Sequence, residues 1–209
     1  MWAMARPRKP LLSRDRIVET ASALVDAEGL AALSTRRLAA ELGVSGPSLY
    51  NHFRTKDEIL DAVADAVSAK IDLAMFDEDD GRDWRTALYD WARSYRAAFA
   101  AHPRAIPLLT TSPVRAPEVL LQYEQAVTLL LDAGFALPDV MPVIIGLENL
   151  VLGSALDMAA PEAMWELTDE AATPQLARAL GAVDTRTDAA FELALTGYVA
   201  HLRTLLESP

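Results

Sequence analysis

The stretch LSTRRLAAELGVSGPSLYNHFRTK, residues 33–56, contains the signals that decide the fold. Ser34 is suited to an N-cap, because its hydroxyl can accept a hydrogen bond from a free backbone N–H of the next helix. Leu38 and Leu42 are four residues apart, so they share one face of that helix. Gly43 follows where a helix C-terminus needs a residue that tolerates left-handed dihedrals. The pattern predicts a short helix followed by a tight turn.

A second helix is predicted directly after this turn. Ser45 can cap it, and Pro47 is tolerated in its first turn because an early N–H has no partner there. Leu49 and Phe53, four residues apart, are expected to hold the helix on the core. Thr55 then opens a capping box, TKDE, that starts another helix. Two short helices around a glycine turn indicate a helix-turn-helix.

The opposite face of the second helix is small and polar and carries two aromatic hydrogen-bond donors. Such side chains suit base edges and phosphates in the major groove of DNA. We expect Arg36, Tyr50 and Lys56 to contact phosphates. Ser48 and Asn51 are expected to face base edges. The full set of expected DNA-binding residues is Arg36, Ser45, Gly46, Pro47, Ser48, Tyr50, Asn51, His52 and Lys56.

Apolar residues around a glycine turn also occur in helical proteins with no DNA partner, so a packed pair of short helices is the alternative. However, the run TRRLAAELGVSGPSLYNHFRTKDEIL resembles the DNA-binding domain of tetracycline-repressor (TetR) family regulators. The preceding RIVETASALVDAEGLAALS is similar to that family's first helix and linker. The resemblance implies a regulator that binds double-stranded operator DNA. It rests on Thr35-Arg36, Leu38-Ala39, Leu42-Gly43-Val44, Pro47-Ser48-Leu49-Tyr50, His52-Phe53 and Lys56.

Length and composition favour a helical protein with a large core. The chain has 209 residues, of which 52 % are hydrophobic, enough for one large or two small domains. Alanine and leucine dominate, which favours helices, and no alternating strand pattern of useful length is present. We expect an all-α fold. Residues 1–60 would form a three-helix helix-turn-helix DNA-binding domain with a basic N-terminal arm, and residues 61–209 a larger helical ligand-binding and dimerisation domain.

The net charge of −11 argues at first sight against a nucleic-acid partner. Its distribution reverses that interpretation, because residues 1–60 carry a net +2 and residues 61–209 a net −13. Positive charge therefore lies where the motif lies, and the acidic remainder keeps the far side away from phosphates. Arg6, Arg8 and Lys9 form a basic arm that is either a minor-groove contact or a solubilising tail.

Several features indicate a soluble cytoplasmic protein. The chain has no cysteine, which excludes disulfides and Cys-based zinc sites and fits a reducing cytosol. The basic N-terminus lacks the apolar core of a signal peptide. The most apolar run, residues 143–156, is interrupted by Glu148-Asn149 and is shorter than the roughly 20 residues that a membrane span requires. We expect no membrane partner.

Apolar periodicity predicts further helices. The helix at residues 56–76 would link the helix-turn-helix, called the reading head below, to the ligand-binding and dimerisation domain. The acidic run FDEDDGRD, residues 76–83, is expected to break the chain after that link. Residues 159–184 hold several prolines and polar residues and are expected to be mobile or irregular, with weak helical pieces at Met164-Trp165 and at 176–180. The predicted helices outside the motif are 14–28, 56–76, 84–101, 117–133, 138–158 and 187–206.

Residues 83–158 also resemble the ligand-binding and dimerisation domain of the tetracycline repressor, in DWRTALYDWARSYRAAFAAHP, LLDAGF and NLVLGSALDM. The resemblance implies an effector pocket in each subunit and a homodimer built by the helices at 138–158 and 187–206. A Leu195→Glu variant would test this dimer if Leu195 faces the partner. The histidines that hold magnesium–tetracycline in that repressor match Asp72 and a leucine near Leu108 here, which disfavours tetracycline itself.

The candidate ligand-binding residues are mostly aromatic, as expected for a pocket with few polar groups. An ordinary hydrophobic core is the alternative for such an aromatic stripe. Glu148, inside an apolar helix, could face the pocket, the dimer interface or a structural arginine. The candidates are Trp91, Tyr95, Phe99, Leu108, Tyr123, Glu148, Asn149 and Trp165.

No motif in the chain points to catalysis, a metal or a cofactor. The histidines at 52, 102 and 201 are far apart, and no GxSxG, Walker, HExxH or dinucleotide fingerprint is present. The acids at 77–80 are expected to form a solvated loop rather than a cation site. We expect a regulator, a repressor released by a small apolar or aromatic ligand. The alternative is a helix-turn-helix regulator that answers to a protein partner or has no ligand.

Overall fold

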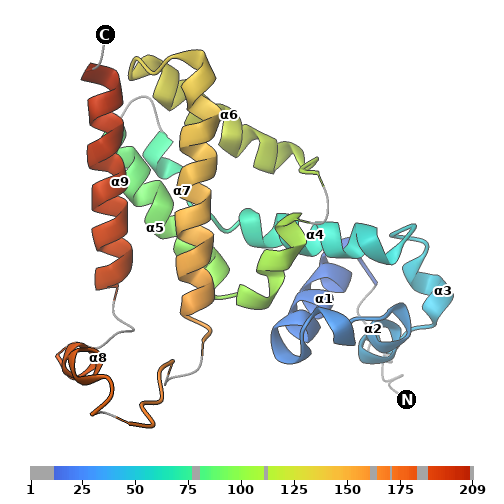
Figure 1. Ribbon diagram of the computed structural model, residues 1–209. Helices are drawn as coiled ribbons and strands as arrows, with labels where there is room; N and C mark the ends of the chain where they lie inside the picture. The colour runs from blue at the N-terminus through green and yellow to red at the C-terminus, as the bar shows by residue number, and fades with distance from the viewer. Residues whose placement is uncertain are drawn as a thin grey trace, which may run out of the picture.

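The computed structural model describes residues 12–76, 81–110, 113–160, 164–169, 171–182 and 188–207, and this part of the chain contains helices and no strand. The expected all-α fold is therefore confirmed. A small head of three helices lies at one end and a larger helical array at the other, with α4 running between them (Figure 1). The elements are α1 Arg14–Glu28, η1 Leu30–Ala32, α2 Thr35–Leu42, α3 Gly46–Leu49, α4 Lys56–Ser68, η2 Ala74–Phe76, α5 Trp84–Ala100, η4 Pro103–Thr110, α6 Pro117–Asp132, α7 Leu137–Asp157, α8 Pro174–Leu180 and α9 Ala189–Glu207.

Helix α1 begins and ends where the sequence predicted. The Ser13 hydroxyl caps it by accepting from the backbone N–H of Arg16 at 3.2 Å, and Gly29 ends it with a φ of 85°. Its apolar stripe is buried against α2 and α4. The buried residues of this stripe are Ile17, Ala21, Leu24 and Val25.

The prediction of one helix from residue 56 to residue 76 was wrong, because α4 ends at Ser68. The apolar periodicity continues past that point, and Ile71 and Met75 are both buried. However, an Asp72 carboxylate oxygen accepts from the N–H of Ala74 at 3.0 Å, a local bond that competes with helix. The N–H of Asp72 itself donates to the Ser94 hydroxyl at 2.7 Å. The link is thus a helix, a turn and the short η2 helix.

Helix α5 is the centre of the larger array and packs on α4, α7 and α9. Helices α7 and α9 lie side by side (Figure 1). The predicted ends of α5, α6 and α7 agree with the structure to within one residue. The last helix begins at Ala189, and the expected start at 187 lies outside the described residues.

The segment predicted to be irregular, 159–184, contains one short helix, α8, which confirms the helical piece expected there. The other helical piece expected there, at Met164-Trp165, was wrong, because residues 164–169 are not helical. Residues 161–163, 170 and 183–184 lie outside the described part of the chain. The same holds for residues 1–11 of the predicted arm and for the acids at 77–80.

Helix α7 is the one described helix long and apolar enough to cross a membrane, with a mean hydropathy of 1.5 over its most apolar window. Helices in the cores of soluble proteins meet the same criterion, and one side of α7 is indeed packed on α5, α6 and α9. The rest of its apolar surface is open. The exposed apolar side chains on the two long helices are Leu137, Met141, Ile145 and Leu156 of α7 and Leu193 and Leu205 of α9.

Candidate functional site

The turn between α2 and α3 has the geometry that its sequence predicts. The Ser34 hydroxyl accepts from the N–H of Arg37 at 3.1 Å, which caps α2. Gly43 adopts left-handed dihedrals, φ 67° and ψ 32°, at the end of α2. The next N–H, of Val44, donates to the carbonyl of Ala39 at 3.0 Å. These bonds close the helix end and aim the chain into α3.

Helix α3 is shorter than predicted, because only Gly46–Leu49 is helical. Ser45 occupies the N-cap position, but its hydroxyl contacts the Ser48 hydroxyl at 2.7 Å rather than a backbone N–H. The N–H of Phe53 still donates to the carbonyl of Leu49 at 3.0 Å, so the chain stays coiled beyond α3. Leu49 and Phe53 are both buried, which confirms their predicted role as anchors.

All nine predicted DNA-binding residues are at least partly exposed. Tyr50 is 54 % exposed. Arg36 and Lys56 take part in no ion pair within the described residues, whereas Arg37 pairs with Glu28 at 3.0 Å and Glu41 at 3.7 Å. The exposed members are Arg36, Ser45, Pro47, Tyr50 and Asn51, and the partly exposed ones are Gly46, Ser48, His52 and Lys56.

Arg14 is the first residue of α1, and its side chain makes a contact within the head that the sequence did not reveal. Its guanidinium lies over the Phe53 ring, 3.9 Å from the centroid, and donates to the carbonyl of His52 at 2.5 Å. A cation on an aromatic face is stabilising. Arg14 therefore ties the start of α1 to the chain that follows α3.

In the larger array, four of the predicted ligand-binding residues line one small recess: Trp91 and Tyr95 of α5, Tyr123 of α6 and Glu148 of α7. Both tyrosine hydroxyls donate to the same carboxylate oxygen, Glu148 Oε1, at 3.2 Å from Tyr95 and 2.5 Å from Tyr123. The buried indole N–H of Trp91 has no acceptor within the described residues. Of the three orientations left open for Glu148, the structure shows the one toward the interior.

Burial sets the protonation behaviour of this recess. It raises the pKa of the Glu148 carboxyl, and the two tyrosine hydrogen bonds offset only part of that rise. Burial and the nearby Glu148 charge also raise the pKa of the Tyr95 and Tyr123 phenols. Both tyrosines therefore stay protonated donors at neutral pH. Within the described residues, the hydrogen-bond donors to Glu148 are these two neutral phenols.

The recess itself is small, with a volume of about 20 Å³. The other four candidates lie outside it. Phe99 is fully buried against Tyr95, with ring centroids 5.2 Å apart, and Leu108 lines a neighbouring cavity of about 70 Å³. Asn149 is exposed on α7, and Trp165 is 52 % exposed beyond the end of that helix.

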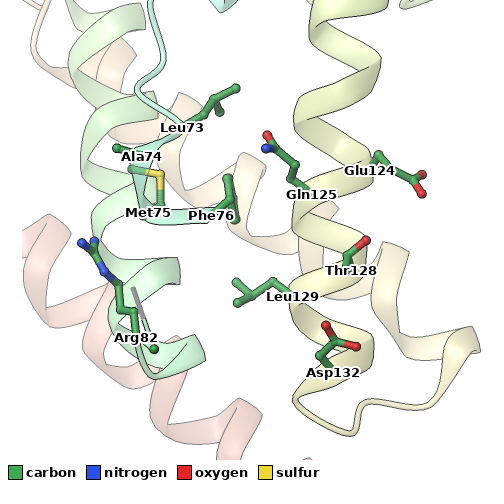
Figure 2. A pocket seen from close by; sticks show the side chains of 11 residues that line it. Leu73, Ala74, Met75, Phe76, Arg82, Glu124, Gln125, Thr128, Leu129 and Asp132 are labelled. Atoms are coloured by element: carbon green, nitrogen blue, oxygen red, sulfur yellow. The ribbon is translucent and has the colours of Figure 1, made fainter. Parts of the chain in front are cut away.

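An open cleft of about 900 Å³, which the sequence did not reveal, lies between η2 and α6. Figure 2 shows Gln125 and Leu129 pointing from α6 toward the η2 segment. The buried Oε1 of Gln125 has no hydrogen-bond donor within the described residues. The four-residue spacing of Gln125 and Leu129 places both on one face of the helix and was the available signal. The cleft is lined by Leu73, Ala74, Met75, Phe76, Gly81, Arg82, Glu124, Gln125, Thr128, Leu129 and Asp132.

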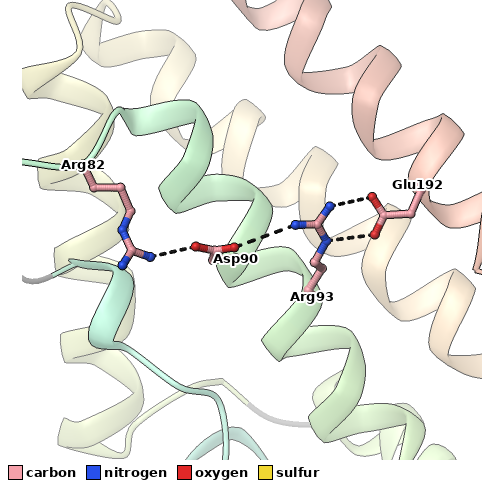
Figure 3. Close-up of polar contacts among 4 residues, drawn as sticks. All are labelled: Arg82, Asp90, Arg93 and Glu192. Carbon is pink, nitrogen blue, oxygen red and sulfur yellow. Dashed lines mark hydrogen bonds and ion pairs between the residues drawn. The ribbon is translucent and has the colours of Figure 1, made fainter.

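A chain of ion pairs holds the rim of this cleft to α5 and α9 (Figure 3). Arg82 at the rim contacts Asp90 at 2.7 Å, and the other oxygen of Asp90 lies 3.8 Å from Arg93. Arg93 then makes a two-bonded contact with Glu192 of α9, at 2.8 and 2.7 Å. Paired guanidinium–carboxylate bonds of this kind orient both side chains. The Arg93–Glu192 contact links α5 to α9.

We expect Glu148→Gln to raise the free energy of unfolding near neutral pH and to leave it unchanged near pH 4, measured by urea denaturation across pH. Because the folded-state pKa lies above the ordinary 4.5, wild type loses stability as the pH rises above that value. Below this pH the Glu148 carboxyl is protonated in both the folded and the unfolded protein. The difference in stability between wild type and Glu148→Gln therefore vanishes. Glutamine keeps an acceptor for both tyrosine hydroxyls. Asp157→Asn, which removes an exposed charge from the same helix, should show no such trend; equal trends in both variants would contradict the assignment.

No group of three or more histidines, aspartates or glutamates is placed to hold a metal ion within the described residues. Two sites thus stand out, an exposed helix-turn-helix face and an interior recess beside a cleft. Helix α4 lies between them and packs on both α1 and α5.

Comparisons with known proteins agree with this arrangement. Residues 17–63 match the family described as bacterial regulatory proteins, tetR family, and residues 77–205 match the tetracyclin repressor-like C-terminal domain. An HTH-type transcriptional regulator of Saccharopolyspora erythraea is 36 % identical over 79 % of this chain and 67 % of its own length. The class C tetracycline repressor protein of Escherichia coli is 31 % identical over 89 % of this chain and 83 % of its own.

A solved structure shares the fold over nearly the whole chain. The Streptomyces coelicolor TetR family protein ActR in complex with actinorhodin superposes with a TM-score of 0.76 at 28 % identity, covering 95 % of this chain and 100 % of ActR. The match spans both the head and the larger array. This chain belongs to the TetR family of DNA-binding bacterial transcription regulators.

Proposed function

We propose that this protein is a homodimeric repressor that leaves a pseudo-palindromic operator when a small apolar or aromatic ligand binds beside α4. The observation that carries the proposal is the position of the α4 C-terminus. Ser68 and Ile71 line the recess together with Trp91 and Tyr95. The head and the recess therefore share one element.

A hydrogen bond ties this end of α4 to the ligand-binding array. The buried amide of Gln122, on α6, donates to the carbonyl of Ser68 at 3.0 Å. Since the recess holds only about 20 Å³, a ligand that enters it must push its walls apart, including α4. The other end of α4 follows the turn after α3. A displaced α4 would therefore change the spacing between the two reading heads of a dimer.

A second set of contacts joins α1 to the segment after α5. His102 contacts Asp26 at 2.7 Å and Lys70 at 2.6 Å. Arg104 donates to the carbonyls of Asp26 and Ala27 at the end of α1, at 3.0 and 2.6 Å. These polar contacts make the head follow movements of η4 as well as of α4.

The ligand must bind the DNA-binding conformation and the released conformation with different affinities. A ligand with equal affinities would not shift the equilibrium between them. By reciprocity, the operator must weaken ligand binding by the same factor by which the ligand weakens operator binding. A pull-down of genomic DNA would supply the operator. A thermal-shift screen of a metabolite library would supply the ligand, because binding raises stability by mass action.

Tyr95→Ala should leave operator affinity near wild type and abolish release by the ligand, measured by fluorescence anisotropy of labelled operator. Tyr95 lines the recess, and its hydroxyl reaches Glu148. Phe99→Ala is the matched control, because Phe99 lies one turn further along α5, is fully buried and is not part of the recess. Release should survive in that variant. If Tyr95→Ala loses DNA binding together with release, Tyr95 is a core residue and its place in the mechanism is wrong.

Lys56→Ala should weaken binding to all DNA sequences alike and reduce the salt slope of log K by about one. Lys56 stands at the start of α4 without an ion-pair partner in the described part of the chain, as expected for a phosphate contact. Arg178→Ala removes the same charge from α8, far from the head, and should change neither quantity. Replacement of the exposed Asn51 should instead change the preference of the protein for one base position of the operator. An unchanged salt slope in Lys56→Ala would refute the phosphate contact.

One observation favours the second candidate, a regulator that responds to a protein partner or lacks a ligand. The recess is far below the roughly 300 Å³ of an ordinary small-molecule site, as a packed core would be. A thermal-shift screen without a single stabilising compound would support that candidate. Under both candidate functions, we propose that the protein is a non-enzymatic cytoplasmic regulator that needs no cofactor and no membrane. Its two domains would divide at residues 60 and 61.

A further inference from the structure

The carboxylate of Glu148 lies in an aromatic recess. Its contacts within the described residues are the two tyrosine hydroxyls on Oε1, and it takes part in no ion pair there. Trp91, Tyr95 and Tyr123 line the same recess. Aromatic faces attract cations, and a carboxylate beside them supplies the opposite charge. The recess thus has the groups that recognise an ammonium ion.

We propose that the effector carries a protonated amine, which binds among Trp91, Tyr95 and Tyr123 with Glu148 as its counter-ion. This inference rests on the proposed function and names the chemical class of its ligand. A bound ammonium would give the Glu148 carboxylate a cationic partner, which the described residues do not supply. This attraction would favour opening the recess, whose volume is about 20 Å³.

The neighbouring cavity adds negative charge. It shares Ser68 and Val119 with the recess and is also lined by Asp61 and Asp65. Burial, and then repulsion by Asp61 and Glu118, raises the pKa of Asp65, and Arg115 also lines this cavity. The residues that line the recess, this cavity and the cleft include five carboxylates and two guanidinium groups. Of those two, Arg82 is already paired with Asp90. An anionic ligand is therefore disfavoured.

The volumes assign different parts of the ligand to different places. About 20 Å³ accommodates one water-sized group, which suits an ammonium head. The cleft of about 900 Å³ is large enough for an apolar body. The rings of Phe76 in the cleft and Trp91 in the recess touch, with centroids 5.6 Å apart. A ligand that occupies both places must displace Phe76, the partly exposed ring of the pair.

The test uses three probes with one naphthalene ring and different charges: 1-naphthylmethylamine, protonated at neutral pH, 1-naphthylmethanol and 1-naphthoate. Isothermal titration of the full-length protein without DNA should show the amine binding at least about tenfold more tightly than the alcohol. The carboxylate should bind most weakly. Glu148→Gln should bring the amine and alcohol within about twofold of each other. Asp157→Asn, an equal loss of charge at an exposed site on α7, should keep the wild-type preference.

Each other result overturns the proposal. Equal binding of amine and alcohol by wild type would show that charge is not recognised, and this arm needs no variant to fold. A preference that survives in Glu148→Gln would place the cation elsewhere. Absence of binding by all three probes would show that the recess does not open for an aromatic amine.

Failure of this inference can be told from failure of the proposed function. A neutral or anionic compound that releases the protein from its operator would overturn the amine and leave the ligand-released repressor intact. An amine that binds through Glu148 while the protein stays on its operator would do the reverse.

Discussion

Ile145→Glu and Leu193→Glu are each expected to make the protein monomeric at micromolar concentration and to weaken binding to a full operator at least about a hundredfold. Leu193 on α9 is 77 % exposed and Ile145 on α7 is 48 % exposed, on two helices that lie side by side. Exposed apolar surface on two such helices is what a two-fold four-helix interface buries. A charge placed there would remain unpaired in the dimer.

The loss of operator affinity follows from valence rather than from contacts with DNA. A dimer binds two half-sites about 34–36 Å apart, or a multiple of that, and its second head binds at a high effective concentration. A monomer loses that advantage although its helix-turn-helix is intact. Analytical ultracentrifugation and anisotropy on full and half operators measure the two effects separately, and half-site affinity should be unchanged.

Leu176→Glu is the matched control, because Leu176 is an exposed leucine on α8, outside the two long helices. It should remain dimeric. Leu195 does not serve this test, because it is fully buried within the protomer and does not face a partner. Variants of Ile145 and Leu193 that both stay dimeric would show that these surfaces are not the interface.

The second large effect is expected from Phe53→Ala, which should lower the free energy of unfolding by about 3–5 kcal/mol and abolish operator binding. Phe53 is 1 % exposed, and the Arg14 guanidinium lies over its ring. Truncation leaves a cavity beneath α3 and removes the surface on which Arg14 is held. A loss of this size is a large fraction of the 5–15 kcal/mol that typically stabilises a domain.

Tyr50→Ala provides the contrast, since Tyr50 is three residues away and 54 % exposed. Its stability should stay within about 0.5 kcal/mol of wild type, while operator binding weakens through the lost phosphate contact. Urea denaturation and operator anisotropy distinguish the two variants. Wild-type stability of Phe53→Ala would contradict the role of that ring as the anchor of the reading head.

The sequence by itself determined the helices and most of their ends. The caps at Ser13, Ser34, Thr55 and Asp83 all form as side-chain bonds to a nearby backbone N–H. Such bonds span two or three residues, and the 3.6-residue period spans four, so both can be read locally. The helix-turn-helix was predictable for the same reason, because Gly43 ends α2 locally and Leu49 and Phe53 lie one helical turn apart.

Tertiary structure decided the rest, where partners come from distant parts of the chain. In the sequence, nothing distinguishes Arg14 from the other basic residues near it. Only the fold places its guanidinium over the ring of Phe53, which is distant in the sequence. Periodicity alone extended α4 to residue 76, but Ser94 binds the backbone at Asp72, where the chain turns. Glu148 had three possible surroundings in an apolar helix, and Tyr95 and Tyr123 from two other helices selected one. Local rules give a helix its length and faces, but what each face meets depends on packing between elements far apart in the sequence.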